Sequence, residues 1–104
     1  MPKKPPRVLT VSPKELLVLE LLVRNRELYG LQLVSGSRGR LKRGTVYVTL
    51  GRMEEKGYVA SRLEEDTPLQ GGLPRRLYRA TPYGRELLAM LASARRRLAL
   101  RFAR

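Results

Sequence analysis

The sequence predicts a mainly α-helical fold that carries a two-stranded β wing. Three patterns between residues 44 and 82 support this prediction. A helical run from Gly44 to Lys56 is followed by two strand-like runs, Tyr58 to Glu64 and Arg75 to Ala80, with a loop rich in Pro, Gly and acid between them. A new helix then begins at Thr81-Pro82. This order of elements is typical of the second half of a winged helix, a fold that reads DNA.

The composition indicates one basic domain with a polyanionic partner. A chain of 104 residues is long enough for one modest core and too short for two. Its 22 Lys and Arg against 9 Asp and Glu give a formal charge of +13. Such self-repulsion does not help folding, so the charge points to a polyanion such as nucleic acid. An Arg-rich codon bias would add to this charge, but it does not explain so lopsided a balance.

The residue types that most enzymes and metal sites need are missing from the sequence. There is no Cys and no His, which excludes disulfides, thiolate and imidazole metal ligands, and the commonest general base. The 9 acidic residues show no metal-ligand spacing, and no Gly-rich phosphate loop is present. We therefore expect neither an enzyme nor a cofactor.

We also expect a cytoplasmic protein that associates with the nucleoid. The longest apolar stretch, Leu16 to Val23, is interrupted by Glu20 and is too short to span a bilayer. The basic residues 1–7 are not followed by the apolar segment and cleavage site of a signal peptide. The absence of Cys fits a reducing compartment.

Local signals divide the chain into three parts. Residues 1–11 form a basic, proline-stiffened arm, residues 12–80 form the winged helix domain, and residues 81–104 form a C-terminal dimerisation helix. Within the domain, a short second helix from Tyr29 to Ser35 and a basic turn, Gly36 to Arg40, precede the third helix. The second helix, the turn and the third helix together predict a helix-turn-helix.

The first helix has a well-defined start and an unusually apolar surface. Ser12 is predicted to cap it, Pro13 fits its first position, and Glu15 completes a capping box. Apolar residues cover much of its circumference, so the helix is predicted to lie centrally in the domain. These residues are Leu16, Leu17, Leu19, Leu21 and Val23.

The third helix has a core face and an outer face of unusual composition. Val46, Leu50 and Met53 recur at helical spacing and should face the core. The opposite face carries Gly44, Thr45, Val48, Gly51, Arg52 and Glu55. A plain solvated face would carry Lys or Glu in place of Val48 and Gly51, and Gly51 costs the helix about 1 kcal/mol relative to Ala. We interpret this face as one that closely approaches another surface.

The wing and the last helix supply two further surfaces. The loop from Glu65 to Pro74 is longer than a tight hairpin needs, and two arginines follow it, which is typical of a wing. In the last helix, apolar residues recur every three or four positions, as in a coiled-coil seam. They are Leu87, Leu91, Ala94, Leu98 and Phe102. A helix of about 30 Å would overhang so small a core, so we predict that this seam pairs with a second copy of the chain.

Five segments together carry a resemblance to a known family. They are Tyr29-Gly30, Gly44 to Tyr47, Met53 to Val59, Leu73 to Thr81 and Gly84 to Leu88. They match the openings of the second and third helices, the end of the third helix, the return strand of the wing and the helix after it. Over roughly residues 16–88, the chain resembles the PadR-like winged-helix transcriptional regulators.

This resemblance implies a homodimeric repressor that reads an inverted-repeat operator, with the C-terminal helix forming the dimer. Val48 departs from the family pattern, which usually has Pro at this position, and the single short last helix matches only the smaller members. The family often senses small aromatic or drug-like molecules. This chain has no Trp and a single Phe, and no effector can be identified from it.

The third helix and its surroundings supply the predicted DNA-binding residues. In the major groove Arg pairs with guanine and an apolar group meets the thymine methyl, so Arg52 and Val48 are the predicted base readers. The residues just before the helix and after the wing loop are placed for phosphate. Tyr47 is either a phosphate contact or a half-buried core residue. The full predicted set is Lys42, Arg43, Thr45, Tyr47, Val48, Thr49, Arg52, Arg75 and Arg76.

Two other functions remain open at this point. The high charge also fits an architectural winged helix that binds DNA or RNA without sequence preference, and competition by unrelated DNA would separate it from a specific regulator. A pure dimerising adaptor would bind no nucleic acid at physiological salt.

Overall fold

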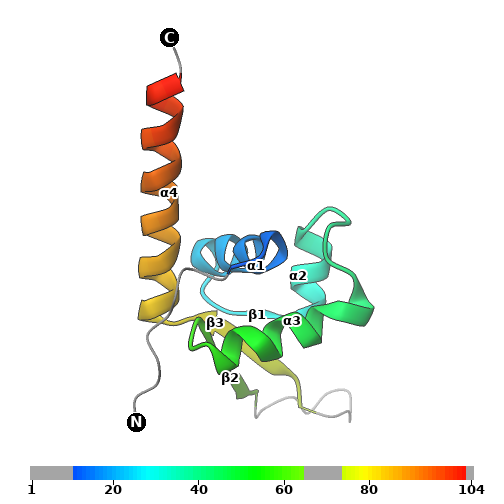
Figure 1. Cartoon of the computed structure of the whole chain (residues 1–104). Coiled ribbons are helices and arrows are strands. Elements are labelled where there is room, and N and C mark those ends of the chain that lie inside the picture. The colour runs from blue at the N-terminus through cyan, green and yellow to red at the C-terminus, as the bar shows by residue number, and fades with distance from the viewer. Residues whose placement is uncertain (1–10, 65–73, 103–104) are drawn as a thin grey trace.

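The computed structural model describes residues 11–64 and 74–102, and its elements follow the predicted order (Figure 1). They are α1 (Pro13–Arg24), β1 (Leu28–Tyr29), α2 (Gly30–Gly36), α3 (Arg43–Glu55), β2 (Val59–Leu63), β3 (Arg76–Ala80) and α4 (Pro82–Phe102). The predicted basic arm, apart from Val11, and the predicted wing loop at 65–73 lie outside the described residues. The mainly α-helical winged helix fold is confirmed.

Helix α1 lies in the middle of the domain, as its apolar surface predicts. It contacts α2, α3, α4 and β3, and in Figure 1 it crosses above α3 and the sheet. Its predicted capping box is present: the Ser12 hydroxyl accepts a hydrogen bond from the Glu15 amide at 3.1 Å, and the Glu15 carboxylate accepts one from the Ser12 amide at 3.0 Å. The core around it consists of Leu17, Val18, Leu19, Leu22, Leu33, Leu41, Val46, Leu50, Met53, Tyr58, Val59, Tyr78, Ala80 and Leu87.

The two predicted wing strands, β2 and β3, are present, and within the described residues β1 adds a third strand to their sheet. The strand order is β1-β3-β2 and both pairings are antiparallel. Strand β1 has only two residues, Leu28 and Tyr29, which pair with Tyr78 and Leu77. Two residues cannot display the alternation by which a strand is recognised in a sequence. The second helix is predicted from the sequence to begin at Tyr29. It begins at Gly30, because Tyr29 belongs to β1.

The turn between α2 and α3 is held by hydrogen bonds of a buried serine. Ser37 is buried, and its hydroxyl donates to the Val34 carbonyl at 2.8 Å and accepts from the Leu41 amide at 2.9 Å. Arg38 and Gly39 both adopt positive φ, at 55° and 85°, which lets the chain reverse direction over two residues. Leu41 then enters the core, so the start of α3 is fixed on the domain.

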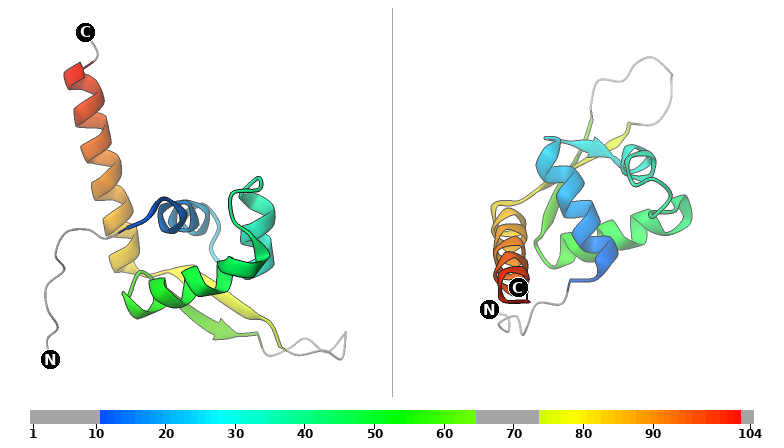
Figure 2. Two further views of the ribbon diagram at one scale, coloured as in Figure 1. Left: turned by 45° about the vertical axis from the view of Figure 1, so that its right-hand side comes forward. Right: turned by 90° about the horizontal axis from the view of Figure 1, so that it is seen from above.

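Helix α4 begins against the domain and then leaves it. The Thr81 hydroxyl caps the helix by accepting from the Gly84 amide at 3.0 Å. Gly84 is needed here, because a Cβ at this position would lie within 2.2 Å of the Tyr58 carbonyl oxygen. The C-terminal half of the helix stands clear of the rest of the chain in both Figure 1 and the left view of Figure 2. The predicted overhang is therefore present.

Candidate nucleic-acid interface

Helix α3 presents the predicted outer face to solvent. Val46, Leu50 and Met53 are fully buried, which fixes the rotation of the helix on the domain. The six residues of the opposite face are all exposed, and the Val48 side chain is 55% exposed. These residues are Gly44, Thr45, Val48, Gly51, Arg52 and Glu55. We call this set the α3 outer face.

Two glycines of the α3 outer face have no packing role among the described residues. A Cβ built on Gly44 or Gly51 would meet no atom within 4 Å. Gly51, in the interior of the helix, costs it about 1 kcal/mol relative to Ala. Since no contact with the described residues 11–64 and 74–102 requires these glycines, the open backbone that they leave is suited to a surface outside the chain that approaches closely.

Thr49 does not belong to the exposed set, although the sequence analysis placed it among the DNA-binding residues. Its side chain is 9% exposed. Thr49 lies three residues after Val46 and four before Met53, and positions at these spacings share the buried side of a helix. We therefore leave Thr49 out of the interface.

Tyr47 lies at the edge of the α3 outer face and packs against α2. A Cβ at Gly30 would come within 2.5 Å of the Tyr47 ring, so the glycine makes room for the tyrosine. The Tyr47 side chain is nevertheless 50% exposed. Tyr47 is thus a half-buried residue packed on α2, and its contact with a phosphate stays a prediction.

The wing begins from a cluster of three side chains. The Arg75 guanidinium lies 4.5 Å above the Tyr29 ring centre, and the Tyr29 hydroxyl donates to the Glu64 carboxylate at 2.7 Å. The hydrogen bond to Glu64 is the main cause that raises the pKa of the Tyr29 hydroxyl above its ordinary value. The cluster therefore holds Arg75 at the base of the wing.

Arg76 is tied to the last turn of α3. Its guanidinium donates to the Ser61 hydroxyl at 3.0 Å, and Ser61 donates to the Glu54 carboxylate at 2.8 Å. This relay connects the two wing strands to α3.

A groove of about 590 Å³ separates the wing base from the start of α2. It is lined by Tyr29, Gly30, Leu31, Gln32, Ser35, Tyr47, Pro74, Arg75 and Arg76. Its walls combine aromatic and aliphatic side chains with two guanidinium groups. A sugar–phosphate strand presents both apolar and anionic surface, and the groove is complementary to both.

Lys42 and Arg43 mark the start of α3 and both are exposed. Lys42 occupies the N-cap position, but its side chain makes no capping hydrogen bond. Residues that cap well, such as Ser or Asp, are absent here. The first amide groups of α3 therefore lie beside two positive charges, an arrangement that favours an anion from outside.

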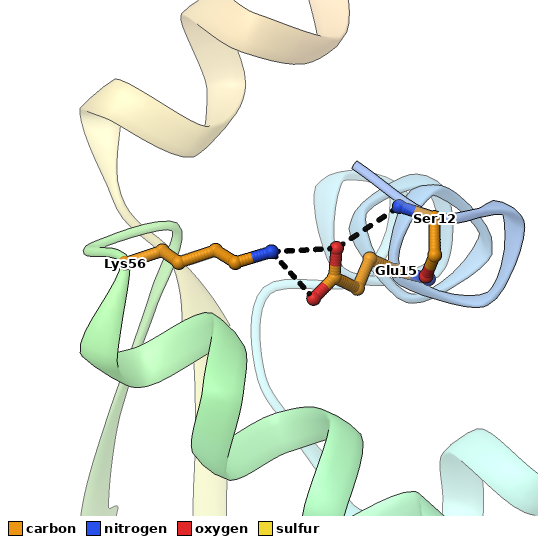
Figure 3. A network of polar contacts seen from close by, with 3 residues as sticks. All are labelled: Ser12, Glu15 and Lys56. Carbon is orange, nitrogen blue, oxygen red and sulfur yellow. Dashed lines mark hydrogen bonds and ion pairs between the residues drawn. The ribbon is translucent and has the colours of Figure 1, made fainter. Parts of the chain in front are cut away.

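Helix α1 and the end of α3 are joined by an ion pair that spacing in the sequence could not reveal (Figure 3). Lys56, the residue after α3, places its ammonium group 3.0 Å from both carboxylate oxygens of Glu15. Glu15 is 4% exposed, and its carboxylate also accepts from the Ser12 amide, so one buried side chain serves both the capping box and the ion pair. The pair links the start of α1 to the end of α3.

The predicted seam of α4 divides into two parts. Leu87 is 2% exposed and belongs to the core of its own domain, so its assignment to the dimer interface is wrong. Leu91 packs partly on the same core, whereas Ala94 and Leu98 are exposed. The side chain of Phe102 lies outside the described residues. Leu87 is buried because the first turns of α4 pack on the core of their own domain, and only the later turns extend beyond it.

The described part of the chain contains neither a metal cluster nor a membrane-spanning helix. No group of three or more Asp, Glu, His or Cys side chains in residues 11–64 and 74–102 is arranged to hold a metal ion. Over the same residues, no helix combines the length and apolar character needed to cross a membrane.

The comparisons with known proteins agree with this geometry. A sequence model described as the transcriptional regulator PadR-like family matches residues 18–90, which is more than half of the 104-residue chain. The chain belongs to this family. This PadR-like protein is thus a DNA-binding transcriptional regulator of the winged helix type, and its family is one of regulators rather than of enzymes. The resemblance inferred from the sequence segments is confirmed. A search of curated proteins gave no match.

Solved structures of other PadR proteins are similar to this one. A PadR family regulator from Clostridium difficile R20291 is 25% identical, with a TM-score of 0.71 over 89% of this chain and 100% of that chain. A PadR family regulator from Eggerthella lenta DSM 2243 is 30% identical, with a TM-score of 0.61 over 81% of this chain and 69% of that chain. Bacillus subtilis PadR, solved with operator DNA, is 24% identical, with a TM-score of 0.62 over 74% of this chain and 45% of that chain. The present chain therefore spans less than half of the Bacillus protein.

Proposed function

We propose that this PadR-like protein is a homodimeric repressor that reads an inverted-repeat operator with α3 and the wing. The observation that carries the proposal is the α3 outer face, which is exposed, contains two glycines without a packing role, and is bordered by cations. An α-helix of this kind fits the major groove, which is about 12 Å wide.

The residues of the interface take distinct roles in this proposal. Arg52 would pair with the O6 and N7 of a guanine, and Val48 would meet a thymine methyl. Lys42 and Arg43 at the start of α3, and Arg75 at the wing base, would contact phosphates. Arg76 would contribute charge near the same strand while its bond to Ser61 aligns the wing. Tyr47 would donate its hydroxyl to a phosphate from its place on Gly30.

The second copy would bind along α4. Ala94 and Leu98 continue the face on which Leu87 and Leu91 pack against the domain, so the apolar face extends beyond the core that covers its first part. Met90 lies beside this face and is also exposed. A dimer with a two-fold axis would present two α3 helices to two half-sites of opposite direction, which requires an inverted repeat. Operator binding is compatible with this fold, because Bacillus subtilis PadR was solved in complex with operator DNA.

Selection of genomic DNA tests the proposal directly. Fragments of the source genome are bound in vitro at about 150 mM salt, where non-specific binding is weak, and the bound fraction is sequenced. We expect a few fragments that share an inverted repeat near promoters, and repression of a reporter placed behind such a site. Binding without enrichment of any sequence would refute the specific regulator.

The alternative function is that of an architectural DNA- or RNA-binding protein. The observation that favours it is the formal charge of +13, which is spread along the whole chain. Uniform recovery of fragments in the same selection, with equal competition by unrelated DNA, would establish this alternative.

A further inference from the structure

The two sides of α3 are built differently. On the side of Tyr47, the helix borders the groove that leads to Arg75 and the wing. On the other side, Thr45 and Arg52 border a second hollow of about 270 Å³ whose far wall is the start of α1. This second hollow, which we call the α1 hollow, is lined by Ser12, Lys14, Glu15, Thr45, Val48, Thr49 and Arg52. No residue of its α1 wall belongs to the interface described above.

Lys14 is the cation on the α1 wall of this hollow, and its side chain is exposed. Lys14 also borders an adjoining depression of about 220 Å³, together with Pro13, Leu17 and Arg40. Arg40 comes from the turn before α3 and is exposed as well. Lys14 thus borders both the α1 hollow, which it shares with the α3 outer face, and the depression that it shares with Arg40.

The single acid of the α1 hollow is compensated within the chain. Glu15 is buried, and its carboxylate is held by the Lys56 ammonium at 3.0 Å and by the Ser12 amide at 3.0 Å. The ion pair cancels the carboxylate charge close to its source. The charges that the hollow presents to solvent are then those of Lys14 and Arg52, and both are positive.

An α-helix with its side chains is about 10–12 Å across, and the major groove is about 12 Å wide. A helix seated in that groove consequently has one sugar–phosphate strand along each of its two sides. Arg75, at the base of the wing, lies on the side of Tyr47, and the α1 hollow lies on the opposite side. We propose that Lys14, assisted by Arg40, contacts phosphates of the strand opposite to the one that the wing contacts, so that α3 is clamped between two backbones. This inference rests on the proposed DNA-reading function, and it adds contacts to the second sugar–phosphate strand of the DNA.

Salt dependence of binding tests the role of Lys14. In Lys14→Gln, affinity for specific and unrelated DNA should fall alike, and the slope of log K against log salt should decrease by about one for each bound half-site. Arg24→Gln is the matched control, because Arg24 is an exposed cation at the other end of the same helix. It should leave the slope unchanged. Equal slopes for the two variants would overturn the inference, and equal unfolding midpoints would confirm that both variants are folded.

Ethylation interference identifies the strand. The DNA is an operator recovered in the genomic selection. Ethylation of phosphates on either of the two DNA strands that border each α3 should prevent binding of the wild-type protein. Lys14→Gln should lose the requirement on one strand, and Arg75→Gln should lose it on the other. Loss on the same strand in both variants would contradict the clamp. If wild-type protein binds no DNA, the proposed function itself fails; if wild type binds and Lys14→Gln matches Arg24→Gln, only the present inference fails.

Discussion

The outer face of α3 and the free end of α4 are both uncovered in the described chain, but their chemistry differs. The α3 outer face carries small and polar side chains with Val48 and Arg52, and cations border it. The free part of α4 carries Ala94 and Leu98 in line with the buried Leu87. Removing apolar surface from water contributes about 25 cal/mol per Å², so the α4 face gains most from another apolar face. The α3 face gains most from an anion that tolerates close approach.

An exposed helix face can therefore indicate either an oligomer interface or a nucleic-acid interface, and its composition distinguishes the two. A helix face continuous with a core is one part of an incomplete core, and a second copy can complete it. A helix face with glycines and no internal contact has been kept open at a cost to the stability of the helix. The substitutions below separate the two surfaces.

The largest effect is expected from Leu98→Glu. Leu98 is 54% exposed and lies on the seam, so a carboxylate there would have to be buried in the dimer without a partner. The protein should become monomeric, and affinity for an inverted repeat should fall by about 100-fold or more, because two linked half-sites are no longer bound together. Sedimentation and titration of operator DNA measure the two results.

Leu100→Glu is the matched control for this change. Leu100 is 75% exposed and lies two residues further along α4, on nearly the opposite side of the helix. It should leave the dimer intact. A dimeric Leu98→Glu protein, or a monomeric Leu100→Glu protein, would contradict the proposed seam.

A smaller and more selective effect is expected from Arg52→Ala. Loss of a bidentate contact to guanine should cost about 1–3 kcal/mol and relax discrimination at one base pair. Arg75→Ala should instead weaken binding to all sequences alike. Titration of a set of operators with single base changes distinguishes the two patterns. Unchanged discrimination in Arg52→Ala would remove Arg52 as a base reader.

The smallest effect of the series concerns the ion pair under α3. Lys56→Met leaves the buried Glu15 carboxylate without its ammonium partner and should lower the free energy of unfolding by about 1–2 kcal/mol, less than for a fully buried pair because Lys56 is 32% exposed. Glu15→Gln should cost less, since Lys56 can turn to water and Gln can still accept in the capping box. Urea denaturation measures both values, and the reverse order would contradict this account of the pair.

Much of the fold could be predicted from the sequence because local rules determine it. The capping box of Ser12 and Glu15, the Thr81 cap and the buried Val46, Leu50 and Met53 all follow from spacing within one helix. The composition of the α3 outer face follows from the same helical period.

The remaining features depend on contacts between residues far apart in the sequence. The pair of Lys56 and Glu15 joins residues 41 positions apart, and β1 is too short to show a pattern. Leu87 has the spacing of a seam residue, but the position at which α4 leaves the core decides its partner. Spacing within one segment could not place Lys14 beside α3, because their proximity arises from the crossing of two helices.

Gly51→Leu tests most directly whether the α3 outer face is the DNA-reading surface. Because a Cβ there meets nothing within 4 Å, the substitution should raise the free energy of unfolding by about 0.5–1 kcal/mol. Ala89→Leu, on an exposed part of α4 away from the seam, is the control for an added leucine. We predict that Gly51→Leu is at least as stable as wild type and binds a selected operator at least tenfold more weakly, while Ala89→Leu binds normally. A stable Gly51→Leu protein with wild-type affinity would contradict the account.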